Sequence, residues 1–121
     1  MIINKERELL EFRVGISECD SYKIMHNSMY FAYFEEGIIC RLIGENLVAF
    51  DRDKPFKVLE SRCRYIHSAK YNDKLKLITQ VQRCDKNQEL IRINQKLIDS
   101  NNTVISICKS LIKIDSERII L

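Results

Sequence analysis

The feature that most constrains the fold is a long apolar segment in the first third of the chain. From Asn27 onward, apolar residues cover two helical stripes, at positions 30, 34 and 38 and around positions 31, 35, 38 and 42. A helix that is apolar over much of its circumference is buried on several sides. Asn27 or Ser28 can cap its start, and Gly44 can end it. Gly37 costs this helix about 1 kcal/mol relative to Ala, so it indicates close packing against a flat surface.

Alternating runs of apolar and polar residues lie on both sides of this helix. Before it, Leu10, Phe12, Val14 and Ile16 alternate with polar residues or glycine, which predicts a strand with one buried face. After a loop around Asp51 to Pro55, four more strands are predicted, at Lys57–His67, Leu75–Arg83, Leu90–Ile98 and Thr103–Ile114. Turn residues separate these strands, at Tyr71–Asp73, Asp85–Gln88 and Asp99–Asn102. The last run is apolar on both faces, as in a central strand.

The order of elements predicts one α+β domain over residues 1–121. It is one strand, one long buried helix and four antiparallel strands. A flat sheet cannot cover a helix all round, but a strongly curved sheet that wraps it can. We therefore expect the hotdog fold, a curved antiparallel five-stranded sheet wrapped around one long central helix. Its exposed sheet edges need a partner, so we expect a homodimer or homotetramer.

Composition limits the classes of function. The chain is 45% hydrophobic and 31% charged, which is ordinary for a soluble globular protein. No segment has the roughly 20 apolar residues of a membrane span, and the start, Met1–Glu6, does not resemble a signal peptide. We therefore expect a cytoplasmic protein. The net charge of +3, spread along the chain, does not indicate nucleic-acid binding but suits an anionic small ligand.

The five cysteines are scattered, at positions 19, 40, 63, 84 and 108, and form no C-x-x-C pair. That pattern argues against a zinc site and against a disulfide framework. The expectation is five reduced thiols, most of them packed as small hydrophobic side chains.

One segment carries a more specific signal. Between Phe12 and Glu35 the chain has Asp20 after the first strand, then the pair His26-Asn27 and Tyr30 near the start of the helix. This pattern resembles the hydroxybenzoyl-CoA thioesterase-like family of hotdog enzymes, which includes many bacterial acyl-CoA thioesterases. The stretch Tyr71–Leu75 is similar to the family's turn of an aromatic residue, glycine and aspartate.

The chain departs from the family at two positions of the loop after Asp20. Many members have glycine where this sequence has Lys23, and histidine where it has Ile24. The loop shape and the role of His26 therefore do not follow from the resemblance.

The resemblance implies a thioesterase that hydrolyses acyl-CoA, with CoA as part of the substrate and no metal or other cofactor. Asp20 is implied as nucleophile or general base, and backbone amides near Asn27 are implied to polarise the thioester carbonyl. The side chains of His26, Asn27 and Tyr30 would line the pocket or hold Asp20. The expected substrate contacts are Tyr22, Ser61, Cys63, Arg62 and Lys70, of which Arg62 and Lys70, with Arg64, could meet CoA phosphates across a subunit boundary.

Each assignment has an alternative that involves no catalysis. An aspartate after a strand commonly organises a loop, and Tyr30 can be a core residue whose hydroxyl is bonded to a neighbour. Glu35 is a rival to Asp20, because some hotdog enzymes use a helix glutamate, although a solvated or ion-paired side chain is favoured. Cys19 is interpreted as packing rather than as a nucleophile, and His67 receives no functional assignment.

Two other functions stay open. One is an acyl-carrier-protein thioesterase that docks an acidic protein through a basic patch. The other is a hotdog module that binds acyl-CoA without turnover.

Overall fold

The computed structural model describes residues 6–42, 56–84 and 87–114. Its elements follow the predicted order of one strand, one helix and four strands, with a short 3₁₀ turn after the first strand. They are β1 (Glu6–Arg13), η1 (Ile16–Glu18), α1 (Asn27–Leu42), β2 (Phe56–Tyr65), β3 (Lys74–Cys84), β4 (Asn87–Asp99) and β5 (Val104–Ile114).

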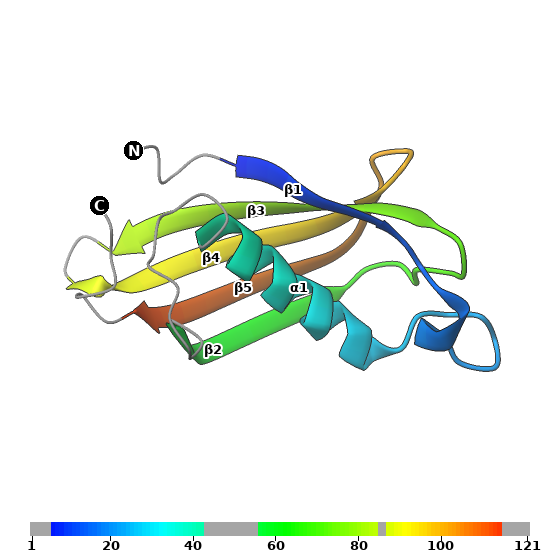
Figure 1. The fold of residues 1–121 in the computed structure, drawn as a ribbon, viewed down its shortest axis with the longest axis horizontal. Helices are drawn as coiled ribbons and strands as arrows, with labels where there is room; N and C mark the ends of the chain where they lie inside the picture. Colours follow the sequence, from blue (N-terminus) through cyan, green and yellow to red (C-terminus); the bar gives the residue numbers. More distant parts are fainter. Residues whose placement is uncertain (1–5, 43–55, 85–86, 115–121) are drawn as a thin grey trace.

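The five strands form one antiparallel sheet in the order β1-β3-β4-β5-β2, and α1 crosses one of its faces (Figure 1). This arrangement confirms the predicted hotdog fold. β5 lies inside the sheet between β4 and β2, as its apolar pattern predicted. β1 and β2 are the two edges of the sheet among the described residues.

The core lies between α1 and the sheet face that it covers, which we call the inner face. Tyr30, Phe34, Ile38 and Leu42 are buried on α1, and their spacing is that of the first predicted stripe. They pack on buried side chains of the strands in two clusters, one toward each end of the helix. The strand partners include Leu75, Leu77, Val81, Ile91, Ile93, Leu97, Cys108, Ile112 and Ile114.

The second predicted stripe is covered only in part, because Ile38 and Leu42 are buried but its first position is not. Phe31 is 47% exposed, although the sequence predicted a helix buried on several sides. The sheet packs against one side of α1, so the side that carries Phe31 stays open. The neighbouring edge strand is open as well, because β2 pairs only with β5 among the residues that the structure describes, and Val58, Leu59 and Tyr65 are between 40% and 48% exposed.

Two details of the predicted strands are wrong. The first strand ends at Arg13, so Ile16 lies in η1 and is 58% exposed instead of buried. The pairing with the segment before β3 continues to Val14, whose amide donates to the Asp73 carbonyl at 3.0 Å, and η1 begins two residues later. In β2 a register shift between Val58 and Glu60 adds Leu59 as an extra residue, which is 48% exposed rather than facing the core.

Three expectations lie outside the described residues: the helix stop at Gly44, the loop from Asp51 to Pro55 and the turn at residues 85 and 86. Within the residues that are described, no helix has the length and apolar character of a membrane span.

Gly37 packs against the sheet as its position predicted. A Cβ atom on Gly37 would lie 2.4 Å from Leu77 Cδ2, 2.7 Å from Gln95 Nε2 and 3.0 Å from Thr79 Oγ1. All three neighbours are buried and cannot easily move. We expect Gly37→Ala to lower the free energy of unfolding by about 1 kcal/mol in urea titrations, because an overpacking cost of about 1–3 kcal/mol exceeds the gain in helix propensity.

Gly15→Ala is the matched control for this prediction. A Cβ atom there would meet only Glu18 side-chain atoms, at 3.4 Å or more, and the φ angle of −84° suits any residue. Its free energy of unfolding should change by no more than about 0.5 kcal/mol. Equal losses in both variants would contradict a role for close packing at Gly37.

Candidate active site

The loop between η1 and α1 is organised by Asp20. One carboxylate oxygen, Oδ1, accepts hydrogen bonds from the amides of Tyr22 at 2.8 Å and Ile24 at 3.2 Å. The Lys23 amide closes the same turn on the Asp20 carbonyl at 3.0 Å. Asp20 is exposed, and no hydrogen bond reaches its second oxygen from the part of the chain that the structure describes. One oxygen therefore shapes the loop, and the other faces solvent.

Lys23 has a φ angle of 62°, in the left-handed region. This is the position at which many members of the family named above have glycine, and glycine adopts this conformation without strain. Asn72, in the later turn, also takes the place of a family glycine and has a φ angle of 70°. The two turns therefore keep a conformation that suits glycine, although the residues are Lys and Asn.

Backbone hydrogen bonds fix the loop to the rest of the molecule. The Met25 amide donates to the Ala69 carbonyl at 2.8 Å, and the Tyr71 amide donates to the Lys23 carbonyl at 2.8 Å. The loop thus lies against the segment that joins β2 to β3. It ends where α1 begins, at Asn27, and the first amides of a helix have no acceptor within the helix.

A pocket of about 140 Å³ lies at this end of α1. Asn27 and Tyr30 line it from the helix, and His67 and Ser68 line it from the segment after β2. The remaining lining residues are Ile24, Met25, Tyr65 and Ile66. The pocket therefore joins the start of the helix to the end of the edge strand.

Tyr30 is a core residue with a bonded hydroxyl, as its structural interpretation predicted. Its side chain is buried, its hydroxyl oxygen accepts the Ala69 amide at 3.0 Å, and its ring meets Tyr65 edge to face with centroids 5.1 Å apart. Burial raises the pKa of the Tyr30 hydroxyl. At neutral pH this group is therefore a neutral phenol that can polarise a carbonyl but cannot serve as a base.

A second carboxylate near the loop has a structural arrangement that the sequence did not predict. Glu18 accepts the Gly15 amide at 2.8 Å and the hydroxyl of Tyr33, whose ring stacks on Phe12 with centroids 3.6 Å apart. Burial, and then the bond to Glu18, raise the pKa of Tyr33. This arrangement ties the end of η1 to α1.

Cys19 shows the packing role that was predicted for it. Its thiol donates to the Gly15 carbonyl at 3.5 Å. Burial, and then the charges of Asp20 and Glu18, raise the pKa of the Cys19 thiol, which disfavours the thiolate needed for nucleophilic attack.

The other predicted site residues, with the rival Glu35, are spread over four places. Asp20, Tyr22 and His26 are exposed and do not line the pocket at α1, although the loop that carries them leads into it. Lys70 lines a neighbouring pocket of about 460 Å³ that shares His67 and Ser68 with the first. Glu35 is half-buried on α1.

The remaining three predicted contacts are on β2 and face opposite ways. Ser61 and Cys63 contact the buried Cys108 of β5 from the inner face of the sheet. Arg62 lies between them in sequence and points to the other face, which we call the outer face.

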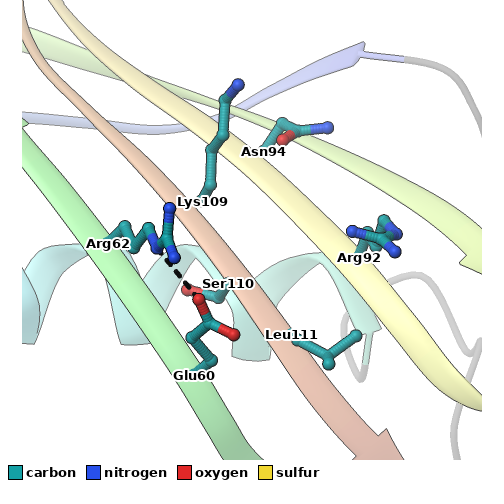
Figure 2. Close-up of a pocket in the computed structure, with 7 residues that line it drawn as sticks. All are labelled: Glu60, Arg62, Arg92, Asn94, Lys109, Ser110 and Leu111. Atoms are coloured by element: carbon teal, nitrogen blue, oxygen red, sulfur yellow. Dashed lines mark ion pairs between the residues drawn. The ribbon is translucent and has the colours of Figure 1, made fainter.

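Arg62 lines a cationic hollow of about 200 Å³. In Figure 2 the lining side chains lie on this outer face, with α1 behind the sheet. Arg62, Lys109 and Asn94 stand side by side on β2, β5 and β4, because Lys109 is the backbone partner of both others. Glu60 pairs with Arg62 at 2.9 Å. Arg92 and Lys109 have no ion pair with any described residue. The other lining residues are Ser110 and Leu111.

The comparisons with known proteins identify the family. The model of the thioesterase-like superfamily matches residues 14–117 of this chain. The chain belongs to this superfamily. The match includes the loop after Asp20, the helix and all strands except β1. No curated protein matches the sequence at a significant level.

Solved structures similar to this member of the superfamily share its fold at low sequence identity. A probable thioesterase from Bartonella henselae has a TM-score of 0.74 and 17% identity, over 94% of this chain and 92% of its own. A Staphylococcus aureus protein in complex with CoA has a TM-score of 0.75 and 15% identity, over 93% and 72%. A Streptococcus mutans protein bound to acetyl-CoA has a TM-score of 0.72 and 13% identity, over 87% and 77%.

The left-handed conformation of Lys23 gives a stability prediction for this superfamily member. A non-glycine residue in this region costs the folded state about 1–2 kcal/mol. Glycine avoids this cost, but part of the gain is lost because glycine gives the unfolded chain more conformational freedom. We expect Lys23→Gly to raise the free energy of unfolding by about 0.5–1 kcal/mol, measured by chemical denaturation. Asn72→Gly should change it by less, because Asn tolerates this conformation. A loss of stability in Lys23→Gly would contradict this explanation.

Proposed function

We propose that this protein hydrolyses acyl-CoA thioesters to CoA and a carboxylic acid. The observation that carries the proposal is the pocket at the start of α1, in a chain of the thioesterase-like superfamily. Backbone amides at the start of α1, near Asn27, and the positive end of the helix dipole can stabilise the negative oxygen that forms when a thioester carbonyl is attacked. No metal or prosthetic group enters this reaction, and CoA is part of the substrate.

In this proposal, Asp20 supplies the carboxylate. Its Oδ1 is fixed by the amides of Tyr22 and Ile24, so Oδ2 is held at a defined place on the loop that leads into the pocket. That oxygen can attack the carbonyl carbon or take a proton from an attacking water. His26 and Asn27, where the loop meets the helix, would position the thioester.

A second copy of the chain would complete the site. Among the described residues β2 has an unpaired edge and carries exposed apolar side chains, of which Tyr65 also lines the pocket, and Phe31 of α1 is exposed as well. Unpaired strand edges associate readily with other strands, and a twofold pairing of β2 with its copy would cover this surface. We therefore propose a homodimer, or a tetramer built from it, with sites at the subunit boundary.

The CoA part of the substrate would meet basic residues. Arg92 and Lys109 in the outer-face hollow, beside Arg62, are free to bind phosphate groups, and Lys70 lines the pocket next to the site. Arg forms bidentate hydrogen bonds with phosphate. Similar folds that were solved with CoA or acetyl-CoA bound are consistent with this substrate class.

The same hollow also favours a second candidate, an acyl-carrier-protein thioesterase. Arg62, Arg92 and Lys109 form an exposed cationic surface with Glu60 as the acidic residue among the lining side chains. Such a surface can attract an acidic carrier protein. Rates on acyl-CoA and on acyl-carrier protein, compared side by side, distinguish the two substrates.

The first test measures thiol release from short, medium, long-chain and aromatic acyl-CoAs with the wild type, Asp20→Asn and Asp20→Ala. An asparagine side-chain oxygen can still accept the two amides that Oδ1 accepts, but it cannot act as nucleophile or base. We expect Asp20→Asn to keep the wild-type stability and lose at least about 100-fold in kcat, since a general base contributes about that much or more.

Asp20→Ala separates the structural from the chemical role. It removes both hydrogen bonds, so its free energy of unfolding should also fall, by about 1–2 kcal/mol. Full activity of Asp20→Asn would exclude Asp20 as the catalytic group. No turnover of any acyl-CoA or acyl-carrier protein by the folded wild type would favour a module that binds without hydrolysis.

The outer-face hollow can be tested separately through binding of the substrate. If Arg62 and Lys109 contact phosphate groups of CoA, then Arg62→Gln and Lys109→Gln should each raise KM by about 10-fold, which is the loss expected for a charged hydrogen bond. The value of kcat should stay unchanged, because the reacting atoms lie elsewhere. Lys57→Gln is the control, an exposed cation on β2 outside the hollow. Equal effects in all three variants would indicate only a change in net charge.

A further inference from the structure

A pair of thiols on the inner face of the sheet is placed to react with each other. Cys63 on the edge strand β2 and Cys108 on β5 are direct backbone partners, and their Sγ atoms are 2.9 Å apart. Both thiols are free. The proposed hydrolysis uses neither of them as a reacting group.

The backbone geometry suits a covalent link. Directly opposite residues of antiparallel strands have Cα atoms about 4.5–5.5 Å apart, within the 4.4–6.8 Å that disulfides span. Their Cβ atoms are about 4.5–5.5 Å apart, which is close to the disulfide range of about 3.5–4.5 Å. A small movement of β2 relative to β5 would close the difference.

The surroundings favour the reduced pair at rest. Cys108 is buried and Cys63 is half-buried, and Ser61 Oγ lies 3.3 Å from Cys108 Sγ and 3.0 Å from Ser110 Oγ. Burial, and then the bond to Cys108, raise the pKa of Cys63 to about 12. The thiolate is therefore scarce at neutral pH. Oxidation should accelerate about tenfold for each unit by which the pH is raised toward that pKa.

We propose that Cys63 and Cys108 form a reversible disulfide that links the edge strand β2 to β5 when a low-molecular-weight disulfide acts as the oxidant. Cys63 is the more exposed of the two thiols. Its thiolate attacks one sulfur of the oxidant and releases one thiolate. The Cys108 thiolate then attacks the Cys63 sulfur of the mixed disulfide and releases the second. The two protons lost by the cysteines end on the two released thiols, so the oxidant is reduced as the pair is oxidised.

A disulfide between these cysteines would restrict the movement of β2 next to the proposed site. Cys63 lies two residues before Tyr65, which lines the pocket at α1, and Cys108 packs in the same core cluster as Tyr30. A link at this place would fix the end of β2 against the sheet. It would also close a loop of more than 40 residues in the unfolded chain, which stabilises the folded state.

The test treats the folded protein with excess bis(2-hydroxyethyl) disulfide at mildly alkaline pH, followed by alkylation, digestion and mass spectrometry. We expect free thiols to fall from five to three, with one cross-linked peptide pair that joins Cys63 to Cys108. The midpoint temperature of unfolding should rise by roughly 5–10 °C and return to its starting value when a reducing agent is added.

Matched variants decide the assignment. Cys63→Ser should show neither the cross-link nor the rise in midpoint temperature, whereas Cys40→Ser, which removes a half-buried thiol of α1, should show both. Five free thiols in the treated wild type, or a cross-link between other cysteines, would overturn the proposal. Because these readouts require no substrate, a failure here is distinguishable from a failure of the proposed hydrolysis.

Discussion

The close approach of α1 to the sheet at Gly37 determines where the rest of the molecule can lie. Beneath this residue, Gln95 Nε2 donates to the Phe34 carbonyl at 2.7 Å and to Thr79 Oγ1 at 3.1 Å. A hydrogen bond from a sheet side chain to a helix backbone carbonyl fixes the depth and position of the helix, which packing of apolar side chains alone leaves less defined. With the middle of α1 held there, its first turn lies over the end of β2, and the pocket forms between them.

The loop before α1 depends on the same placement. Its amides and carbonyls reach Ala69 and Tyr71 of the segment between β2 and β3, while Tyr33 of α1 holds Glu18 at the start of the loop. The loop that carries Asp20 is therefore held by these backbone hydrogen bonds and by the contact of Glu18 with the helix. Its exposed oxygen is a defined feature of the surface, because the other oxygen is bound within the turn.

The sequence predicted the fold well because its patterns were local. Period-two strands and one apolar helix were enough for the element order, and the two-sided apolar pattern of residues 103–114 correctly indicated an interior strand. The misplaced Ile16 and Leu59 have a common cause, since each lies where the chain leaves regular hydrogen bonding, and alternation carries no signal for a bulge or a turn. The exposure of Phe31 reflects the limits of a single chain, because a pattern of apolar residues does not tell which molecule covers them.

The candidate site was predictable only in part. Asp20, Asn27 and Tyr30 were found through a resemblance, and the φ angles of Lys23 and Asn72 show that both turns adopt a conformation that suits glycine. The roles assigned to the site residues stay predictions. His67 and Ser68 carried no signal, because they follow a strand without any periodic pattern, and only the tertiary structure brings them to the start of α1. The pairing of Cys63 with Cys108 was equally hidden, since it depends on the register of two strands that are distant in sequence.

The extra residue at Leu59 sets which positions of the edge strand face each side of the sheet. From Glu60 to Tyr65 alternate positions carry unrelated tasks, with Arg62 on the cationic outer face and Cys63 on the inner face. The bulge, and not the identity of the residues, determines whether a position faces the inner or the outer side of the sheet. A deletion of one residue here would leave the composition almost unchanged, yet it could turn a guanidinium toward the core and a thiol toward solvent. In this strand, insertions and deletions are therefore constrained more severely than substitutions.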